Sequence, residues 1–231
     1  MKKLILGSLL LSSATVNAGI ISGGELLDQS GASFLETQLG MGDLDFTNIS
    51  NLTAGASSAT WHANVSGYTN VISIYDVTFQ GNNYLLGGYS TIGHDGIGYS
   101  NDAGATSDNF LFNISLGILH NTQSPPWSGQ YDQYDNSSYF ATFGGGHDIF
   151  GGSATLGSGY IHASSSYGNG YSYGGGDHLL GSGVTGFQNI TINGLESFVF
   201  ESAVDVPEPS SFVLLGLGLA GLGYTRKRKN V

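Results

Sequence analysis

No lysine or arginine occurs between Ile20 and Tyr224 of this 231-residue chain. All six basic residues lie at the two ends, and the 17 Asp and Glu residues give a formal net charge of −11 at pH 7. The body therefore has only its histidines as partners for side-chain ion pairs. Because it cannot neutralise phosphates with Lys or Arg, binding of the body to nucleic acid or to an anionic membrane is strongly disfavoured.

The composition indicates how such a body can fold. It has no cysteine, so no disulfide can stabilise it, while 40% of the residues are hydrophobic and 38 are glycine. Stability must then come from apolar burial and backbone hydrogen bonds. The length suits one domain rather than two large ones.

The first residues have the pattern of a secretory signal peptide. Lys2 and Lys3 precede an apolar run over residues 4–11, and Val16-Asn17-Ala18 follows as a cleavage site that ends in a small residue. We predict a signal peptide over residues 1–18, cleaved after Ala18, and export through the Sec machinery. An uncleaved anchor is the alternative, but the apolar run is short for a hydrocarbon layer about 30 Å thick.

The last residues form a second recognisable signal. An apolar stretch over residues 212–224 follows a Pro-Glu-Pro motif and precedes a basic end. The motif is Pro207, Glu208 and Pro209, and the basic end includes Arg226, Lys227 and Arg228. This order resembles the PEP-CTERM sorting tail of Gram-negative bacteria. The basic end should stay cytoplasmic, which leaves the body outside the inner membrane.

That resemblance has specific implications for residues 206–231. It implies a transmembrane helix over residues 212–224, recognition by an exosortase, and a final place at the cell surface or in an exopolysaccharide matrix. An ordinary C-terminal anchor predicts the same topology without the cleavage.

Between these signals the pattern predicts a mostly β domain over residues 34–201, after a lead-in at 19–33 and before a linker at 202–205. β-Branched and aromatic residues predict a hairpin of residues 71–79 and 84–89, and helical spacing predicts helices near 34–39 and 57–64. Further strands are predicted at 109–115, 139–143, 160–163 and 190–200, the last with a bulge or a turn at 193–194. We expect a two-sheet antiparallel β-sandwich with one or two flanking short helices.

The body also resembles the TLDc domain, a module of eukaryotic oxidation-resistance proteins. The matching residues, which the resemblance makes structural, are Trp61, His62, Gly87, Gly88, Phe110, Phe112, Phe143, Gly144, Gly145, Gly146, Asp148 and Glu196. The resemblance implies a β-sandwich without an agreed catalytic centre. The family's link to the vacuolar proton pump does not carry over to an exported chain.

The chemistry-bearing residues favour binding over catalysis. Gly144 to Gly146 could cradle an anion or allow close packing, and packing is favoured because no Lys or Arg is near. We expect no catalytic residue, resident metal or cofactor, although Ca²⁺ could bind residues 101–108. His62 is predicted to be a half-buried, hydrogen-bonded residue. The tyrosines Tyr131, Tyr134, Tyr139, Tyr160, Tyr167, Tyr171 and Tyr173 could stack on sugars or pack as edge residues.

Two functions follow. The first is an exported surface or matrix protein whose body is a non-catalytic binding or structural module, with extracellular polysaccharide as a partner. The alternative is an extracellular carboxylate- or metal-dependent hydrolase that acts on polysaccharide.

Overall fold

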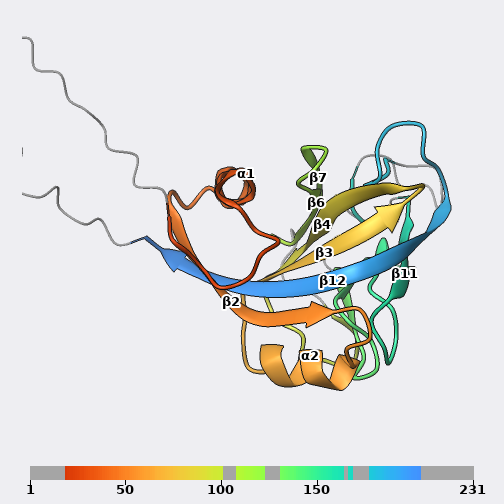
Figure 1. The fold of residues 1–231 in the computed structure, drawn as a ribbon, viewed down its shortest axis with the longest axis horizontal. Coiled ribbons are helices and arrows are strands. Elements are labelled where there is room, and N and C mark those ends of the chain that lie inside the picture. The colour runs from red at the N-terminus through yellow and green to blue at the C-terminus, as the bar shows by residue number, and fades with distance from the viewer. Residues whose placement is uncertain (1–18, 101–107, 123–130, 164–165, 169–176, 204–231) are drawn as a thin grey trace, which may run out of the picture.

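The computed structural model describes residues 19–100, 108–122, 131–163, 166–168 and 177–203. Within these ranges the chain is mostly β, with two short helices (Figure 1). The helices are α1 (Gln29–Leu39) and α2 (Ser58–Val65). The strands are β1 (Ile21–Ser22), β2 (Leu44–Thr53), β3 (Val71–Phe79), β4 (Asn82–Ser90), β5 (Gly98–Ser100), β6 (Phe110–Asn113), β7 (Ile118–Asn121), β8 (Gln133–Asp135), β9 (Thr142–Phe143), β10 (Ile149–Phe150), β11 (Ser158–His162) and β12 (Phe187–Ser202).

All twelve described strands belong to one hydrogen-bonded sheet, so the predicted pair of separate sheets is replaced by a continuous one. The long strand β12 causes this. Its first part pairs with β11 and its second part with β2, while β3 pairs along the middle of β12. Register shifts after Ile192 and Ser197 bend β12, because an extra residue on one strand increases the local twist. The first of these shifts resolves the predicted bulge or turn at 193–194 as a bulge.

Apolar residues fill both faces of the centre of this sheet. On one face, Leu35 of α1 packs in a cluster with Ile72, Ile74 and Phe198. On the other face, Trp61 of α2 belongs to a cluster that runs through β3 to the second half of the chain. The two helices therefore cover opposite faces of the sheet (Figure 1). A strand buried on both faces explains the nearly continuous apolar sequence of β3.

Local signals determine where the helices and the hairpin begin and end. Asp28 caps α1 by accepting a hydrogen bond from Gly31 N, and Gly40 ends it in a left-handed conformation. Ser57 caps α2 by accepting a hydrogen bond from Thr60 N. The β3–β4 hairpin is also confirmed, but Asn82 and Asn83 pair with Phe79 and Thr78 rather than lying in the turn.

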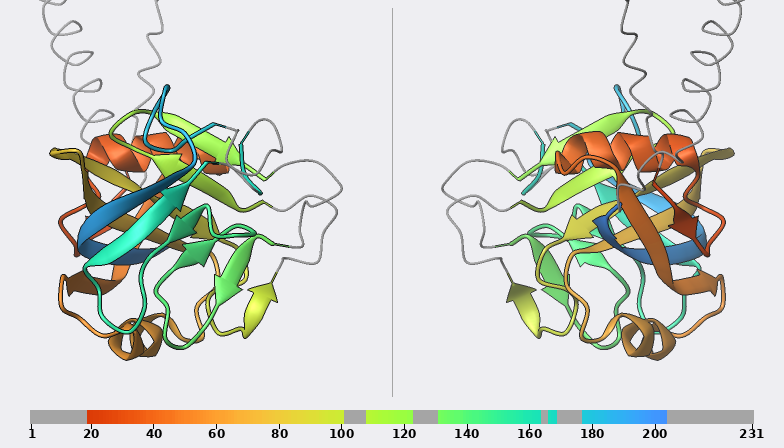
Figure 2. Two further views of the ribbon diagram at one scale, coloured as in Figure 1. Left: turned by 90° about the vertical axis from the view of Figure 1, so that its right-hand side faces the viewer. Right: turned by 90° about the vertical axis from the view of Figure 1, so that its left-hand side faces the viewer.

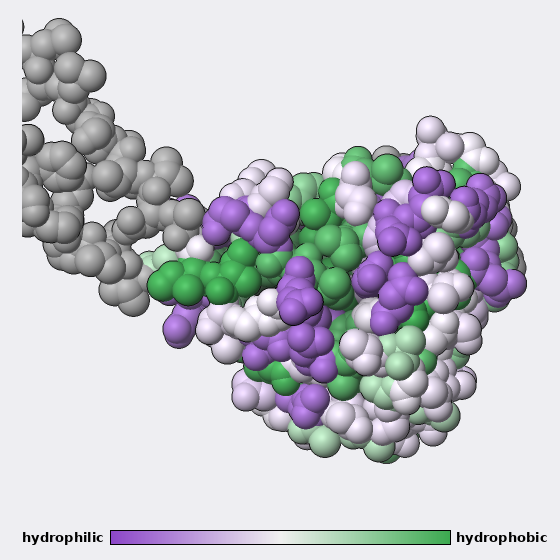
Figure 3. All heavy atoms as spheres, viewed as in Figure 1, coloured by the Kyte–Doolittle hydropathy of each residue, from purple (hydrophilic) through white to green (hydrophobic). Residues whose placement is uncertain are grey.

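Both ends of the body leave from the same place. The Ile20 N–H donates to Asp45 Oδ1, and the Ala203 N–H donates to the Asp43 carbonyl. Figure 1 shows the two chain ends leaving one narrow end of the molecule, and Figure 3 shows apolar residues at the surface there. Strands β5 and β8–β11 lie at the opposite end, which faces the viewer in the left panel of Figure 2.

The predicted processing signals lie outside the described residues. These are the signal peptide at 1–18, the sorting tail at 206–231 and its apolar helix at 212–224. Within the described ranges, no helix is long and apolar enough to cross a membrane.

Candidate functional site

A connected set of aromatic rings covers the end of the molecule opposite the chain ends. We call it the aromatic surface, and it consists of Tyr99, Tyr131, Tyr134, Tyr139, His147, Phe150, Tyr160 and Phe187. Cross-strand pairing places several of these residues together. Tyr99 lies opposite Tyr134, and Phe150 lies opposite Tyr160. Such directly opposed residues are the closest side-chain neighbours in a sheet.

The rings of the aromatic surface pack on one another as well as facing solvent. The ring centroids of Tyr160 and Phe187 are 4.1 Å apart, with an angle of 35° between the planes. Tyr99 meets Tyr131 edge-on at 4.9 Å. Two of these rings are exposed, since Phe187 is 52% exposed and Tyr99 43%, while the other six are half-buried. The surface is thus fixed in shape and offers ring edges, hydroxyl groups and two exposed rings.

His147 is held in this surface by a strained backbone. Its φ is 64°, a left-handed conformation that non-glycine residues seldom adopt and that costs about 1–3 kcal/mol. The conformation places its ring nearly parallel to that of Phe150, with centroids 5.8 Å apart. Burial among the rings lowers the pKa of His147, an effect that the Gly144 backbone partly opposes. His147 is therefore a neutral aromatic component of the surface at pH 7.

The glycines before His147 pack rather than cradle an anion. The three N–H groups of Gly144, Gly145 and Gly146 donate to the Asp132 carbonyl, to Ser166 Oγ and to the Tyr99 hydroxyl. A Cβ at position 144 would lie 2.3 Å from Asp148 Oδ2. The three donors are thus occupied by protein, and Gly144 permits the close approach of Asp148.

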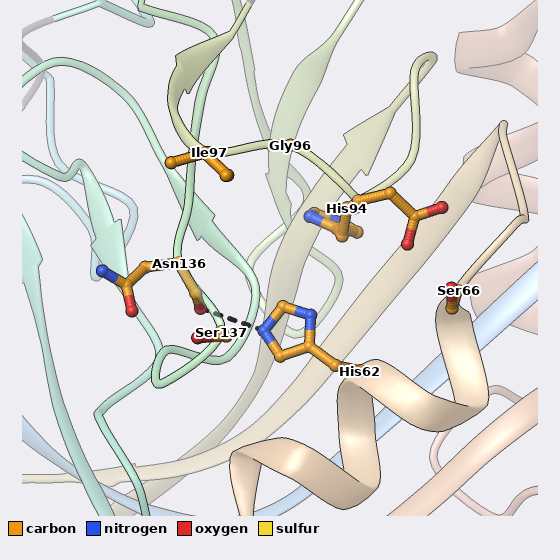
Figure 4. Close-up of a pocket in the computed structure, with 8 residues that line it drawn as sticks. His62, Ser66, His94, Gly96, Ile97, Asn136 and Ser137 are labelled. Carbon is orange, nitrogen blue, oxygen red and sulfur yellow. Dashed lines mark hydrogen bonds between the residues drawn. The ribbon is translucent and has the colours of Figure 1, made fainter.

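A cavity of about 390 Å³ lies between the end of α2 and the loops at 93–97 and 136–137 (Figure 4). His62 and His94 lie close together on one side of it, with Ile97 and Asn136 across from them. His62 Nε2 donates towards the carbonyl oxygens of Asn136 and Tyr139, at 3.0 and 2.9 Å. This agrees with the prediction of a half-buried, hydrogen-bonded His62.

His94 and Asp135 form a buried pair behind this cavity. His94 Nδ1 lies 3.4 Å from Asp135 Oδ1, and Gln133 Nε2 donates to the same carboxylate. His94 Nε2 is enclosed and makes no hydrogen bond, and its ring packs against Trp61 at 4.9 Å. Among the described residues, no nucleophilic side chain is hydrogen-bonded to this nitrogen.

A second cavity, of about 540 Å³, is lined by His120 and His178 beside Asp177. Burial, with a smaller contribution from the nearby imidazoles of His120 and His162, lowers the pKa of His178 to about 4, although backbone hydrogen bonds at Gly186 and Ile161 oppose the shift. Burial also lowers the pKa of His120 and of His162. Within the described ranges, no three His, Asp or Glu side chains are arranged to hold a metal ion. Most of the predicted Ca²⁺ segment, residues 101–107, lies outside those ranges.

The residues of the TLDc resemblance have structural positions. Trp61 Nε1 donates to Ser197 Oγ at 3.0 Å, and Phe110, Phe112 and Phe143 are buried. A Cβ on Gly87 would lie 1.8 Å from the Ser73 carbonyl oxygen, and one on Gly88 would lie 2.7 Å from the Phe143 ring. The buried Glu196 carboxylate accepts the N–H groups of Glu25 and Leu26, at 2.7 and 3.0 Å. These residues therefore stabilise the core and the edge strands of the sheet and do not form a single site.

The sequence predicted part of the aromatic surface. Tyr131, Tyr134, Tyr139 and Tyr160 do come together, but Tyr167 is buried and its hydroxyl donates to the Asp132 carbonyl at 2.6 Å. Tyr171 and Tyr173 lie outside the described residues. Tyr99, Phe150 and Phe187 were missed. Phe150 precedes the glycine pair Gly151-Gly152, and Phe187 follows Gly186. Glycines often mark the ends of strands, so these positions could have been predicted as aromatic residues at strand ends.

Comparison with known proteins adds one finding. A family described as the PEP-CTERM protein-sorting motif matches residues 205–229. No curated protein matches the chain. The comparisons show no TLDc domain, so that assignment stays a prediction. The matched motif is typical of exported, surface-directed proteins of Gram-negative bacteria that an exosortase recognises.

Proposed function

We propose that this chain is an exosortase-processed protein of the cell surface or extracellular matrix, whose body is a non-catalytic module that binds an uncharged polysaccharide. The observation that carries the proposal is the aromatic surface at the end of the body opposite the chain ends. A chain held at its sorting motif would then turn this surface away from its attachment.

Charge supports an uncharged polymer as the ligand. The body has no Lys or Arg, so an anionic polymer would meet carboxylates without any basic Lys or Arg side chain to pair with. A sugar ring can pack its C–H face on the exposed rings of Phe187 and Tyr99, while tyrosine hydroxyls donate and accept hydrogen bonds along the row.

The His94–Asp135 pair is the feature that would favour a hydrolase instead. We prefer a binding module because His94 Nε2 is buried and has no hydrogen-bond partner among the described residues, so the pair lacks the nucleophile that covalent hydrolysis by a His–Asp pair would use.

The test is binding of the exported protein to polysaccharide prepared from the producing cells. We expect Phe187→Ala combined with Tyr160→Ala to weaken binding at least tenfold, since loss of stacking on each ring costs about 1 kcal/mol. Tyr68→Ala is the matched control, because Tyr68 is 44% exposed but lies outside the aromatic surface. Equal loss in the control, or equal binding by all three proteins, would contradict the proposal.

A further inference from the structure

Gly19, the first described residue, is buried at the edge of the sheet. The backbone just after it is fixed on β2. The Ile20 N–H donates to Asp45 Oδ1 at 2.7 Å, and the Phe46 N–H donates to the Ile20 carbonyl at 2.8 Å. The strand β1 then continues this contact by pairing in parallel with β2. The position of residue 19 is therefore set by hydrogen bonds on the residue that follows it.

The space around Gly19 admits no side chain and contains a carboxylate. A Cβ on Gly19 would lie 1.8 Å from the Leu44 carbonyl oxygen, which only glycine avoids, and 3.1 Å from Glu36 Oε1. Glu36 is itself held in place, because its Oε1 accepts the Leu44 N–H at 2.9 Å. The Glu36 carboxylate is thus fixed within a few ångströms of the Gly19 backbone.

We infer that removal of the leader at the Ala18–Gly19 bond creates an α-ammonium group on Gly19 that pairs with the Glu36 carboxylate and completes this edge of the domain. Hydrolysis of the bond consumes one water and leaves a carboxylate on Ala18 and the ammonium on Gly19. Before cleavage the same nitrogen is an uncharged amide. The inference rests on the export part of the proposed function, not on polysaccharide binding.

Charge makes this group unusual in the mature body. With no Lys or Arg between Ile20 and Tyr224, the new ammonium is its one fixed cation. A carboxylate within a few ångströms favours the protonated amine, so its pKa should lie above the roughly 7.7–8.0 of an ordinary α-amino group. The leader's removal would therefore add an ion pair that the precursor cannot make.

The absence of lysine also makes the test selective. Protein recovered from producing cells is first checked for Gly19 as its N-terminal residue by mass spectrometry. It is then treated at pH 8 with an amine-reactive ester, and peptide mapping separates the Gly19 product from any product at Lys227 or Lys229 of a retained tail. We expect Gly19 in the folded protein to react about fivefold more slowly than in urea, because a rise of one unit from a pKa of about 8 lowers the neutral fraction of the amine at pH 8 from about one half to about one tenth.

Two variants assign this protection to Glu36. Glu36→Gln should react at a rate near that of the unfolded chain, although its amide oxygen can still accept the Leu44 N–H. Glu25→Gln, an exposed carboxylate near the same edge, should keep the protection. As an independent measurement, wild-type protein acetylated at Gly19 in urea and refolded should melt about 2–4 °C lower than the free amine form.

The outcomes that overturn the inference are specific. A mature N-terminus at another residue, rapid reaction of Gly19 in the folded chain, or unchanged protection in Glu36→Gln would each do so. A chain that retains residues 1–18 would count against the proposed export as well. A correctly cleaved chain with a freely reacting amine would overturn this inference alone.

Discussion

Glu196 shows how a body without Lys or Arg accommodates a buried carboxylate. Its side chain is 2% exposed, and the N–H groups of Glu25 and Leu26 donate to its two oxygens. Burying a carboxylate is costly unless hydrogen bonds replace its hydration, and backbone N–H groups supply them here. Asp148 is held in the same way by the Ser166 N–H, at 3.0 Å. Backbone donors thus replace the cations that other proteins use.

Replacing Glu196 with alanine should lower the free energy of unfolding by about 2–4 kcal/mol, because two backbone N–H groups lose their acceptor. Urea unfolding monitored by circular dichroism measures the loss. Glu201→Ala is the control, since Glu201 is exposed on the same strand, and it should change the free energy by less than about 0.5 kcal/mol. Similar losses in both variants would show that the backbone contacts of Glu196 contribute little.

One side chain, that of Asp28, determines where helix α1 begins. Asp28 Oδ1 accepts the Gly31 N–H at 2.8 Å, and Leu35 from this helix is buried against the sheet. The cap therefore positions a core residue as well as satisfying a helix donor.

Asp28→Ala should destabilise the protein by about 1 kcal/mol through loss of this cap. A shift of the urea midpoint at constant slope is the expected observation. Gln29→Ala, at the next and exposed position, should leave the midpoint nearly unchanged. An unchanged midpoint in Asp28→Ala would mean that packing of Leu35 alone maintains the helix.

Some elements could be predicted from local signals and others could not. The β3–β4 hairpin and α2 follow from β-branched runs and a serine cap, which act over a few residues. The ten-residue strand β2 was missed because Asn48 and Asn51 have low strand propensity, and its pairing with β12, about 150 residues later in the chain, supplies its stability. The continuous sheet was missed for the same reason, since only the full length of β12 joins β11, β3 and β2. Four tyrosines of the aromatic surface were predictable, but their grouping with Tyr99 and Phe187 depends on that long-range pairing.

On the scale of the whole molecule, buried histidines should make stability depend on pH. The pKa of His178 falls from 6.5 in the unfolded chain to about 4 in the folded one, and burial lowers the pKa of His120, His147 and His162 in the same direction. Between pH 6.5 and 4 the unfolded chain therefore binds more protons than the folded chain. Stability from these groups is fully present above pH 6.5 and is lost as the pH falls towards 4.

Urea midpoints at pH 7, 6 and 5 should thus decrease in that order. His178→Gln should flatten the decrease, because it removes the group with the largest shift. A midpoint that is constant or rises on acidification would contradict the assignment of neutral buried imidazoles.

The uniform negative charge of the body predicts a second whole-molecule response. Raising the ionic strength from about 0.01 to 0.15 M shortens the screening distance from roughly 30 to 8 Å, so repulsion among the carboxylates weakens and the melting temperature should rise. NaCl and KCl should act equally, since screening depends on charge alone. A further rise with CaCl₂ at equal ionic strength would reveal bound Ca²⁺, and no rise with any salt would contradict self-repulsion.

Residues 19 and 203, the two ends of the described body, lie close together, and this allows the chain to be rearranged by circular permutation. Because both flank the start of β2, a short peptide could join them and new ends could be opened at the β3–β4 turn without crossing the sheet. Such a circular permutant would be attached at the opposite end of the molecule, so the aromatic surface would face its attachment point. The native chain order therefore makes the aromatic surface face away from the point of attachment.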